Sequence, residues 1–324
     1  RLPRDVAVKR VSHRVVRAHS PCGVVSITGV VGYIVSVPFV QSRAVSVSRR
    51  FCGRYCFTAT GRMTGMTVVA VYATHGLGTE CLRRLADADD IRVPLVVTYP
   101  PDEDVWWDDT VFDTARDLEV NVVPIEEERA VLDHDVTYLL SVYYPNILDG
   151  ELLNHPTEGA LNLHQAELPR YRGSNVFAHA IMNARDDDHW RYGTTLHEMV
   201  ESVDAGPIVD RRFVEIREDD TARSLYDRTE QASIELFEEW LPAIAEQRVL
   251  DDTTPQDEFD TEQYFYYKDS LDDLFYIEPE ALAADDLKKQ LAVYDRIRAL
   301  EFPPLDPAYT TVGDETVYLT TRSE

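Results

Sequence analysis

Cysteine, lysine and methionine are scarce in this chain, each occurring four times among 324 residues. Three of the cysteines lie within the first 65 residues, so the rest of the chain holds a single one and no disulfide framework is indicated. Cys52 and Cys56 lack a second pair at a metal-binding spacing, and we therefore expect no metal site. The absence of a disulfide pattern fits a reducing compartment, and we expect a cytoplasmic protein.

Long unbroken apolar runs are also lacking. Residues 22–41 form an uncharged stretch that six cations precede, an order that resembles a signal-anchor. Glycines, serines and Pro38 interrupt this stretch, and further arginines follow it. We therefore interpret residues 1–65 as a basic N-terminal extension, disordered or not native, and expect no membrane association; the signal-anchor is the minority interpretation.

Positive charge is in short supply beyond this extension. Residues 1–65 carry eleven Lys or Arg against one acid, whereas residues 66–324 carry 21 against 57, so contributions of +10 and −36 give the net charge of −26. An acidic, lysine-poor body indicates adaptation to concentrated salt, where charge repulsion is screened. It also argues against binding to nucleic acid, whose phosphates attract clustered Lys and Arg.

From Met66 onward, segments that predict strands alternate with segments that predict helices. This alternation favours an α/β fold with a mostly parallel sheet covered by helices. Gly76-Leu-Gly78 lacks the third glycine of a dinucleotide fingerprint, which argues against NAD binding. The predicted strands are residues 68–72, 93–98, 120–123, 135–143 and 161–164, and the predicted helices are residues 79–85, 110–118 and 221–241.

A polar, acidic stretch after residue 250 predicts the boundary between a main domain, residues 66–250, and a C-terminal accessory segment, residues 251–324. The accessory segment is expected to hold a helix over residues 281–300 and a β-hairpin around Gly313-Asp314. Because a lone hairpin is marginally stable, we expect it to pair with the body or with a second subunit, which would give a homodimer.

Polar side chains follow apolar, strand-like runs at two places. Asn162 and His164 lie two residues apart on a predicted strand and therefore project to the same face, and Asp204 begins an Asp-Ala-Gly turn. An amide that donates to an oxyanion, an imidazole that carries a proton and a carboxylate that pairs with it are suited to acyl transfer onto an amine. By spacing alone the pattern is weak, because an isolated Asn-x-His is more often structural.

Four motifs surround these residues in order. They are Asn162-Leu-His164, Leu168-Pro169-x-Tyr171-Arg172-Gly173, Gly193-Thr-Thr-Leu-His197-x-Met199 and Asp204-Ala-Gly206-x-Ile208-Val209. Together they resemble the formyltransferases that use 10-formyltetrahydrofolate, Rossmann-like enzymes that act on methionyl-tRNA, glycinamide ribonucleotide or sugar amines. The resemblance, from about residue 66 to about residue 242, implies a formyltransferase domain with 10-formyltetrahydrofolate as co-substrate. It also implies that Asn162, His164 and Asp204 are the catalytic Asn, His and Asp.

Two further segments resemble the sugar-amine branch of that family, especially the 4-amino-4-deoxy-arabinose enzymes. They are Trp106-Trp107 and the pair Tyr143-Tyr144 at a strand end. The resemblance implies that the folate lies against two short segments, mainly through backbone contacts. These segments contain Asn146, Ile147 and Leu148 in the first and Val200, Glu201, Ser202 and Val203 in the second. The alternative for Ile147 and Leu148 is ordinary core packing.

Two departures from the family concern the acceptor. Ser174 stands where the arabinose enzymes carry an Arg, and the loop at residues 184–192 is longer and more acidic than usual. Because both are expected to border the acceptor pocket, the resemblance predicts the chemistry more firmly than the acceptor. His197 belongs to a shared motif, and we expect it to pack beside the site rather than to react.

The leading hypothesis is N-formyl transfer from 10-formyltetrahydrofolate to a small amine acceptor, a nucleotide-linked amino sugar. Methionyl-tRNA formylation comes second, but residues 251–324 hold six Lys or Arg against nineteen acids, the reverse of what tRNA requires. A third hypothesis is hydrolysis of formyltetrahydrofolate, with water in place of the amine. A fourth is a catalytically silent protein that only binds folate or a nucleotide sugar.

Overall fold

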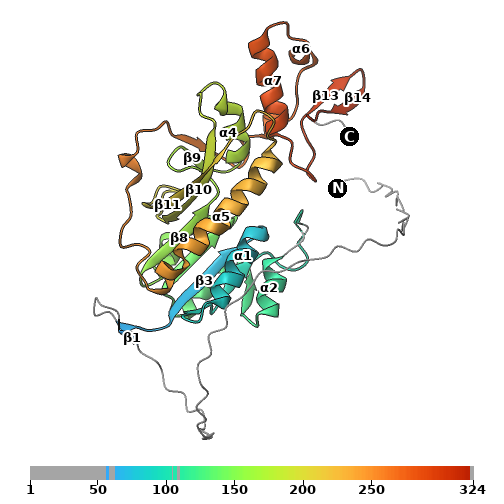
Figure 1. The fold of residues 1–324 in the computed structure, drawn as a ribbon. Coiled ribbons are helices and arrows are strands. Elements are labelled where there is room, and N and C mark those ends of the chain that lie inside the picture. The colour runs from blue at the N-terminus through green and yellow to red at the C-terminus, as the bar shows by residue number, and fades with distance from the viewer. Residues whose placement is uncertain (1–55, 58–62, 104, 108–109, 322–324) are drawn as a thin grey trace, which may run out of the picture. The chain divides into compact units, whose positions relative to one another are not determined.

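The computed structural model describes residues 56–57, 63–103, 105–107 and 110–321 (Figure 1). The signal-anchor candidate at residues 22–41 and almost all of the basic extension lie outside the described residues. From Arg54 onward the chain forms one compact unit. The boundary expected after residue 250 stays a prediction.

A central sheet organises this unit. In order across the sheet its strands are β11 (Ile208–Glu215), β10 (Arg191–Glu198), β8 (Gly159–His164), β7 (Tyr138–Val142), β3 (Thr67–Ala73), β5 (Val96–Thr98) and β6 (Val122–Pro124), and β4 (Ile91–Arg92) also pairs with β3. The strands from β8 to β6 pair in parallel, whereas β10 joins β8, and β11 joins β10, antiparallel. The predicted α/β fold with a mostly parallel sheet is confirmed.

Helices cover both faces of the sheet, which explains why its central strands are continuously apolar. One face packs against α1 (His75–Asp87), α2 (Val111–Asp117) and α5 (Ala222–Ala245). The other packs against the 3-10 helix η1 (Ile125–Asp133) and α3 (Gly150–Leu153). Consecutive residues of β3 alternate between the two cores: Val71 lies in the first and Tyr72 in the second.

Two predicted helix starts have different outcomes. The helix predicted from residue 221 is confirmed, because Thr221 and Ser224 form a reciprocal capping box at the start of α5. The helix predicted from residue 79 begins four residues earlier, at His75. Thr74 is its N-cap in extended backbone, so the helix starts directly at the end of β3.

The helix expected over residues 281–300 is wrong as a single element. It is divided into α6 (Pro279–Leu282) and α7 (Leu287–Ala299). Asp286 explains the restart, because its carboxylate accepts a hydrogen bond from the Lys288 amide at 3.3 Å and so caps α7. The predicted hairpin is confirmed as β13 (Tyr309–Val312) and β14 (Glu315–Tyr318).

Several short elements have no counterpart in the sequence-based expectations. They are β1 (Cys56–Phe57), β2 (Met63–Thr64), β9 (Tyr171–Gly173), α4 (Val176–Ala184), the 3-10 helices η2 (Gln256–Glu258) and η3 (Asp272–Leu274), and β12 (Tyr264–Tyr266). Of these, β12 pairs in parallel with β9. A Cβ on Gly173 would lie 2.0 Å from the Tyr266 carbonyl oxygen, so this close approach requires glycine. The segment that follows α5 therefore packs back onto the body.

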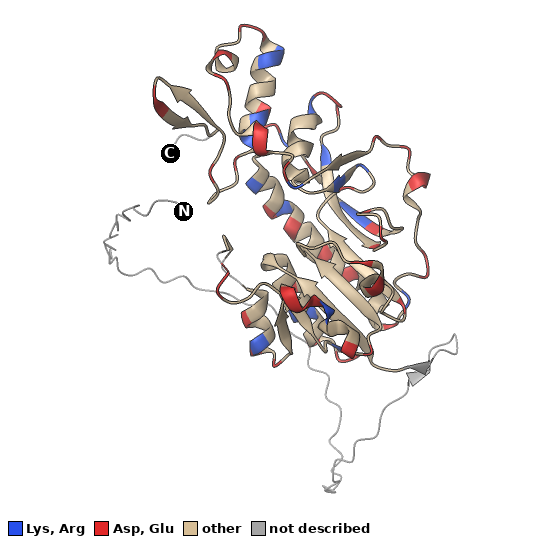
Figure 2. Cartoon of the chain, turned by 180° about the vertical axis from the view of Figure 1, so that it is seen from behind, with Lys and Arg blue, Asp and Glu red and all other residues tan. Residues whose placement is uncertain are grey.

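Charged side chains are distributed unevenly over the described elements. Residues 66–324 hold 57 acidic residues against 21 Lys or Arg, and Figure 2 marks both kinds along the described elements. Adaptation to concentrated salt and a cytoplasmic location stay predictions. Within the part of the chain that the structure describes, every helix is too short or too polar to cross a bilayer.

Helix α7 is anchored to the body by a buried arginine. Arg298 is fully buried, and its guanidinium donates to the Asp295 carboxylate at 2.8 Å and to the carbonyl oxygens of Arg217 and Asp220 at 3.1 and 2.9 Å. Arg185, at the end of α4, donates to the same Asp295 carboxylate at 2.8 Å. These bonds join α7 to α4 and to the approach to α5.

Substitution of Arg298 by Met should therefore destabilise the protein. The side chain keeps its apolar length, but two buried carbonyls lose their donor and Asp295 loses one partner. We expect the free energy of unfolding to fall by about 3 kcal/mol, measured by urea denaturation. Lys289→Met, on an exposed position of the same helix, is the control. A loss below about 1 kcal/mol for Arg298→Met would contradict the anchoring role.

Candidate active site

Strand β8 and the turn after β10 bring Asn162, His164 and Asp204 together. On β8, Asn162 lies opposite Ser141 of β7 and opposite His197 of β10. Asn162 and His164 project to the sheet face that carries Ala160, because side chains alternate along a strand. His164 ends β8, so the pair lies at the carboxyl edge of the parallel strands, where active groups of such sheets occur.

Asp204 reaches this pair from the turn between β10 and β11. Its Oδ2 lies 3.6 Å from His164 Nε2, and its Oδ1 lies 3.5 Å from Asn162 Nδ2. The side chains of His164 and Asp204 retain 14% and 10% exposure, so a small substrate could reach them while bulk water is largely excluded. The three residues singled out in the sequence thus form one cluster.

The backbone of this turn explains the Asp-Ala-Gly motif. Asp204 has φ 51°, in the left-handed region that non-glycine residues seldom adopt. Its Oδ2 accepts a hydrogen bond from the Gly173 amide at 2.9 Å. A Cβ on Gly206 would lie 1.9 Å from the Glu198 carbonyl oxygen, so any larger residue would push the turn away from β10.

His197 packs behind the cluster, as the sequence analysis expects, and orients Asn162. His197 is buried, and its Nδ1 donates to the Glu198 carbonyl at 2.7 Å. Its Nε2 is therefore an acceptor and faces Asn162 Nδ2 at 3.2 Å. Burial lowers the pKa of His197 to about 4, so the ring is neutral near pH 7.

The His164 ring and the Asn162 amide can each form a hydrogen bond to a bound substrate. His164 Nε2 is buried without a hydrogen-bond partner among the described residues, because 3.6 Å to Asp204 exceeds hydrogen-bonding distance. The Asn162 amide has a long contact of 3.5 Å to Asp204, which it can exchange for a bond to substrate. An amide donor, an imidazole and a carboxylate in this arrangement can stabilise an oxyanion and move a proton.

The residues expected to contact folate lie in two segments on the same side of the sheet. Leu148 is buried in the core on the face of η1 and α3, which Met199 also joins, whereas Ile147 is 74% exposed. Leu148 therefore packs in the core, as the alternative to folate contact expects, whereas Ile147 does not. Asn146 donates to Glu128 at 3.0 Å.

The second segment follows β10 directly. Val200 is 40% exposed, Glu201 and Ser202 are exposed, and Val203 is half-buried. The Glu201 carboxylate approaches Gly150, which brings this segment beside the first. The folate role of both segments stays a prediction.

The two adjacent tyrosines at the end of β7 face opposite sides. Tyr144 donates to the Glu128 carboxylate at 2.7 Å on the face of η1. Tyr143 stacks against His75, with ring centroids 4.7 Å apart, and its buried hydroxyl has no hydrogen-bond partner among the described residues. The end of β7 therefore places one tyrosine on each face of the sheet.

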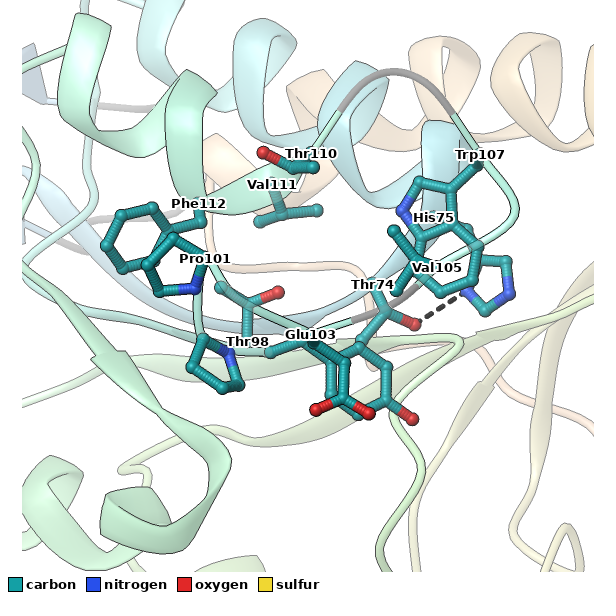
Figure 3. A pocket seen from close by; sticks show the side chains of 12 residues that line it. Thr74, His75, Thr98, Pro101, Glu103, Val105, Trp107, Thr110, Val111 and Phe112 are labelled. Atoms are coloured by element: carbon teal, nitrogen blue, oxygen red, sulfur yellow. Dashed lines mark hydrogen bonds between the residues drawn. The ribbon is translucent and has the colours of Figure 1, made fainter. Parts of the chain in front are cut away.

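A narrow pocket at the ends of β3 and β5 was not expected from the sequence (Figure 3). Its lining includes Thr74, His75, Thr98, Trp107 and Thr110, and its free volume of about 20 Å³ holds about one water. The His75 ring stacks on Trp107 at 3.7 Å, and His75 has φ 61°. His75 follows the first strand of a parallel sheet directly, and this position was the signal in the sequence that could have identified it. Because the helix was predicted to begin at residue 79, His75 was not singled out.

The acidic loop at residues 184–192 carries charges that pair with neighbouring elements, and its expected place beside the acceptor pocket stays a prediction. Asp187 accepts from Arg170 at 2.6 Å and from the Tyr264 hydroxyl at 2.9 Å. Arg185 pairs with Asp295 of α7 at 2.8 Å. These bonds account for the acidic insertion as a contact with the C-terminal segment.

No group of three or more His, Cys, Asp or Glu side chains in the described ranges could hold a metal ion.

Comparison with known proteins finds a family match over the part of the chain that holds this site. Residues 111–241 match the model of the formyl transferase family. A 4-N formyltransferase from Francisella tularensis has TM-score 0.64 and 17% identity over 80% of this chain and 98% of its own. A sugar N-formyltransferase from a Shewanella species has TM-score 0.62 and 18% identity, over 80% of this chain and 98% of its own. An N-formyltransferase from Helicobacter canadensis has TM-score 0.59 and 17% identity, over 77% of this chain and 85% of its own.

The matched stretch contains all three residues of the cluster. The protein is therefore an enzyme of the formyl transferase class. In its fold it is similar, more particularly, to the sugar N-formyltransferases.

Neutral His197 makes stability depend on pH. Its pKa is about 4 in the folded protein and about 6.5 in an unfolded chain, so between these values the unfolded state binds a proton that the folded state does not. Stability is therefore lost as pH falls through this window, by at most about 1.4 kcal/mol per pH unit.

We expect His197→Gln to show a shallower loss of stability between pH 6.5 and 4 than the unchanged protein. Urea denaturation at several pH values measures the two slopes, and carboxyl contributions common to both proteins cancel in the difference. Parallel slopes would show that His197 is not held neutral.

Proposed function

We propose that this protein transfers a formyl group from 10-formyltetrahydrofolate to the amine of a small acceptor, a nucleotide-linked amino sugar. The observation that carries the proposal is the convergence of Asn162, His164 and Asp204 within 3.6 Å at the carboxyl edge of the sheet. The formyl transferase match over residues 111–241 supports the reaction class.

The identity of the donor is supported by similar structures. The Helicobacter canadensis enzyme is described in complex with folinic acid and dTDP-3-aminofucose, and a sugar 3N-formyl transferase in the presence of dTDP and 5-N-formyl-THF. In this protein the donor would lie along Asn146, Ile147 and Leu148 and along residues 200–203. Exposed Ile147 and Val200 offer apolar surface that a flat ring system would cover.

The three polar groups divide the reaction between them. When the acceptor nitrogen attacks the formyl carbon, the Asn162 amide and a ring N–H of His164 donate to the oxygen that becomes negative. Asp204 accepts the proton that the nitrogen loses. The bond between the formyl carbon and N10 of the folate then breaks, and N10 takes up a proton as tetrahydrofolate leaves.

Similar structures support a nucleotide-linked acceptor, since the Helicobacter canadensis enzyme is described in complex with dTDP-3-aminofucose. The acidic C-terminal segment, by contrast, offers little attraction for the phosphates of tRNA.

The direct test incubates the purified protein with 10-formyltetrahydrofolate and a panel of nucleotide amino sugars. Release of tetrahydrofolate together with a formylated sugar in mass spectrometry is the expected result. Release with charged initiator tRNA alone would assign methionyl-tRNA formylation instead. Release of formate without any acceptor would assign hydrolysis.

Asn162→Ala tests the site itself. Because an oxyanion donor is lost, we expect kcat to fall about 10²–10³-fold. Asn121→Ala, on an exposed position before β6, is the matched control and should keep full activity. A silent binding protein would show no turnover before substitution and unchanged folate binding after it.

We further propose that a second copy of the chain covers the C-terminal hairpin. Among the described residues, β13 and β14 form a two-stranded sheet of their own. Val312, Val317 and Tyr318 on it are 65%, 40% and 55% exposed. Tyr309 of β13 bridges to Tyr276 of the same chain, so the hairpin is joined to the body on one side, and the exposed apolar side chains favour association with another chain.

Substitution of Val317 and Tyr318 by Asp should therefore shift the protein from dimer to monomer. Sedimentation velocity measures the change, and Met66→Asp, at an exposed apolar position outside the hairpin, should remain dimeric. A monomer before substitution would contradict the proposed dimer without bearing on the reaction.

A further inference from the structure

The chain beyond α5 returns to the turn that carries Asp204. Thr254 and Ile208 exchange backbone hydrogen bonds of 2.8 Å in an antiparallel bridge. Two residues later Gln256 begins η2, and its side chain is buried, whereas the following Asp257 and Glu258 are exposed. A buried glutamine in an acidic, exposed stretch requires an explanation.

Every bonding group of the Gln256 amide is used. Its Nε2 donates to the carbonyl oxygens of Asp204 and Gly206 at 2.8 and 2.7 Å. Its Oε1 accepts from Arg172 Nη2 at 2.7 Å and from Nε at 3.2 Å. Carbonyls can only accept and a guanidinium can only donate, so the chemistry of the partners fixes the orientation of this amide.

The bonds to Asp204 and Gly206 hold a turn that the backbone alone disfavours. A non-glycine residue at φ 51° costs on the order of 1 kcal/mol and persists only where neighbours impose it. The Gly173 amide fixes the Asp204 carboxylate from one side, and Gln256 fixes its carbonyl from the other. Two segments far apart in sequence therefore set the position of one carboxylate.

Gln256 also binds Arg172, a cation that interacts with this carboxylate. Burial lowers the pKa of Arg172, and the charge of Asp204 opposes this shift, so the two groups interact. The described ion pairs of Asp204 nevertheless involve histidines and not Arg172. With its guanidinium bonded to Gln256, Arg172 leaves Asp204 Oδ2 directed at His164.

We infer that Gln256 is a positioning residue for formyl transfer, which acts by holding the Asp204 turn through its two amide N–H groups. The inference rests on the proposed function, since it assigns to Gln256 the alignment of a carboxylate that moves a proton. Gln256 does not itself reach the reacting atoms. It controls catalysis from the segment that follows α5.

Two substitutions separate the contributions of this side chain. Gln256→Leu removes all of its hydrogen bonds. Gln256→Glu keeps an oxygen for Arg172 but replaces the donating nitrogen with a second oxygen, which faces two carbonyls. We expect kcat to fall about 10²-fold in both, because misplacing a catalytic group by about 1 Å has an effect of that size. KM for donor and acceptor should stay within about twofold, since Gln256 touches neither substrate.

The measurements are steady-state formyl transfer, with the acceptor that the panel identifies, and equilibrium binding of 5-formyltetrahydrofolate, which should be unchanged. Glu258→Leu, on an exposed position of the same short helix, is the matched control and should retain full kcat. Each variant is assayed well below its unfolding midpoint. If Gln256→Leu does not fold, Gln256→Glu, which retains size and the Arg172 contact, decides the question.

Full kcat in Gln256→Glu would overturn the inference, because the donating N–H groups would then be dispensable. A raised KM with unchanged kcat would also overturn it, since the side chain would then serve substrate binding. An unsubstituted protein that forms no formylated product with any acceptor would contradict the proposed function, an outcome distinct from both of these.

Discussion

The carboxylate of Asp204 is the point at which the parts of this structure meet. One oxygen faces His164 at 3.6 Å and accepts from the Gly173 amide at 2.9 Å, while the other faces Asn162. These contacts require β8, β9 and the turn after β10 to keep their relative positions. The glycines at positions 173 and 206 follow from this demand, because each lets two backbone segments approach more closely than a side chain would allow.

Much of the fold could be predicted because it depends on local pattern. The buried strands are apolar runs, α5 begins with Thr221, and Gly313-Asp314 marks the hairpin. Errors arose where a boundary depended on tertiary contacts. α1 begins at His75, in a left-handed backbone conformation that no propensity favours, and the helix expected over residues 281–300 is interrupted where Asp286 caps a new start.

In the candidate site, too, the residues set by local pattern could be predicted and those set by tertiary contacts could not. Asn162 and His164 share a strand face, which their spacing alone indicates, and the resemblance to known formyltransferases strengthened the link between Asp204 and this pair. Gln256 could not be found in this way, because it lies 52 residues from Asp204 in a stretch whose acidic composition suggests a linker. Its role depends on which carbonyls it meets, and only the folded chain supplies that information. His75 was missed for a related reason, since its ring matters through Trp107 and Tyr143.

The parallel pairing of β9 with β12 has a consequence for how the enzyme is made. β9 carries Gly173, the amide donor to Asp204, and its partner strand ends at Tyr266. All residues of the reacting cluster have been synthesised by residue 204, yet the support for their geometry is added some 60 residues later. During translation the nascent chain would thus carry its reactive groups before it can align them. On the proposed role of Gln256, the aligned site would be complete only once the segment after α5 has left the ribosome.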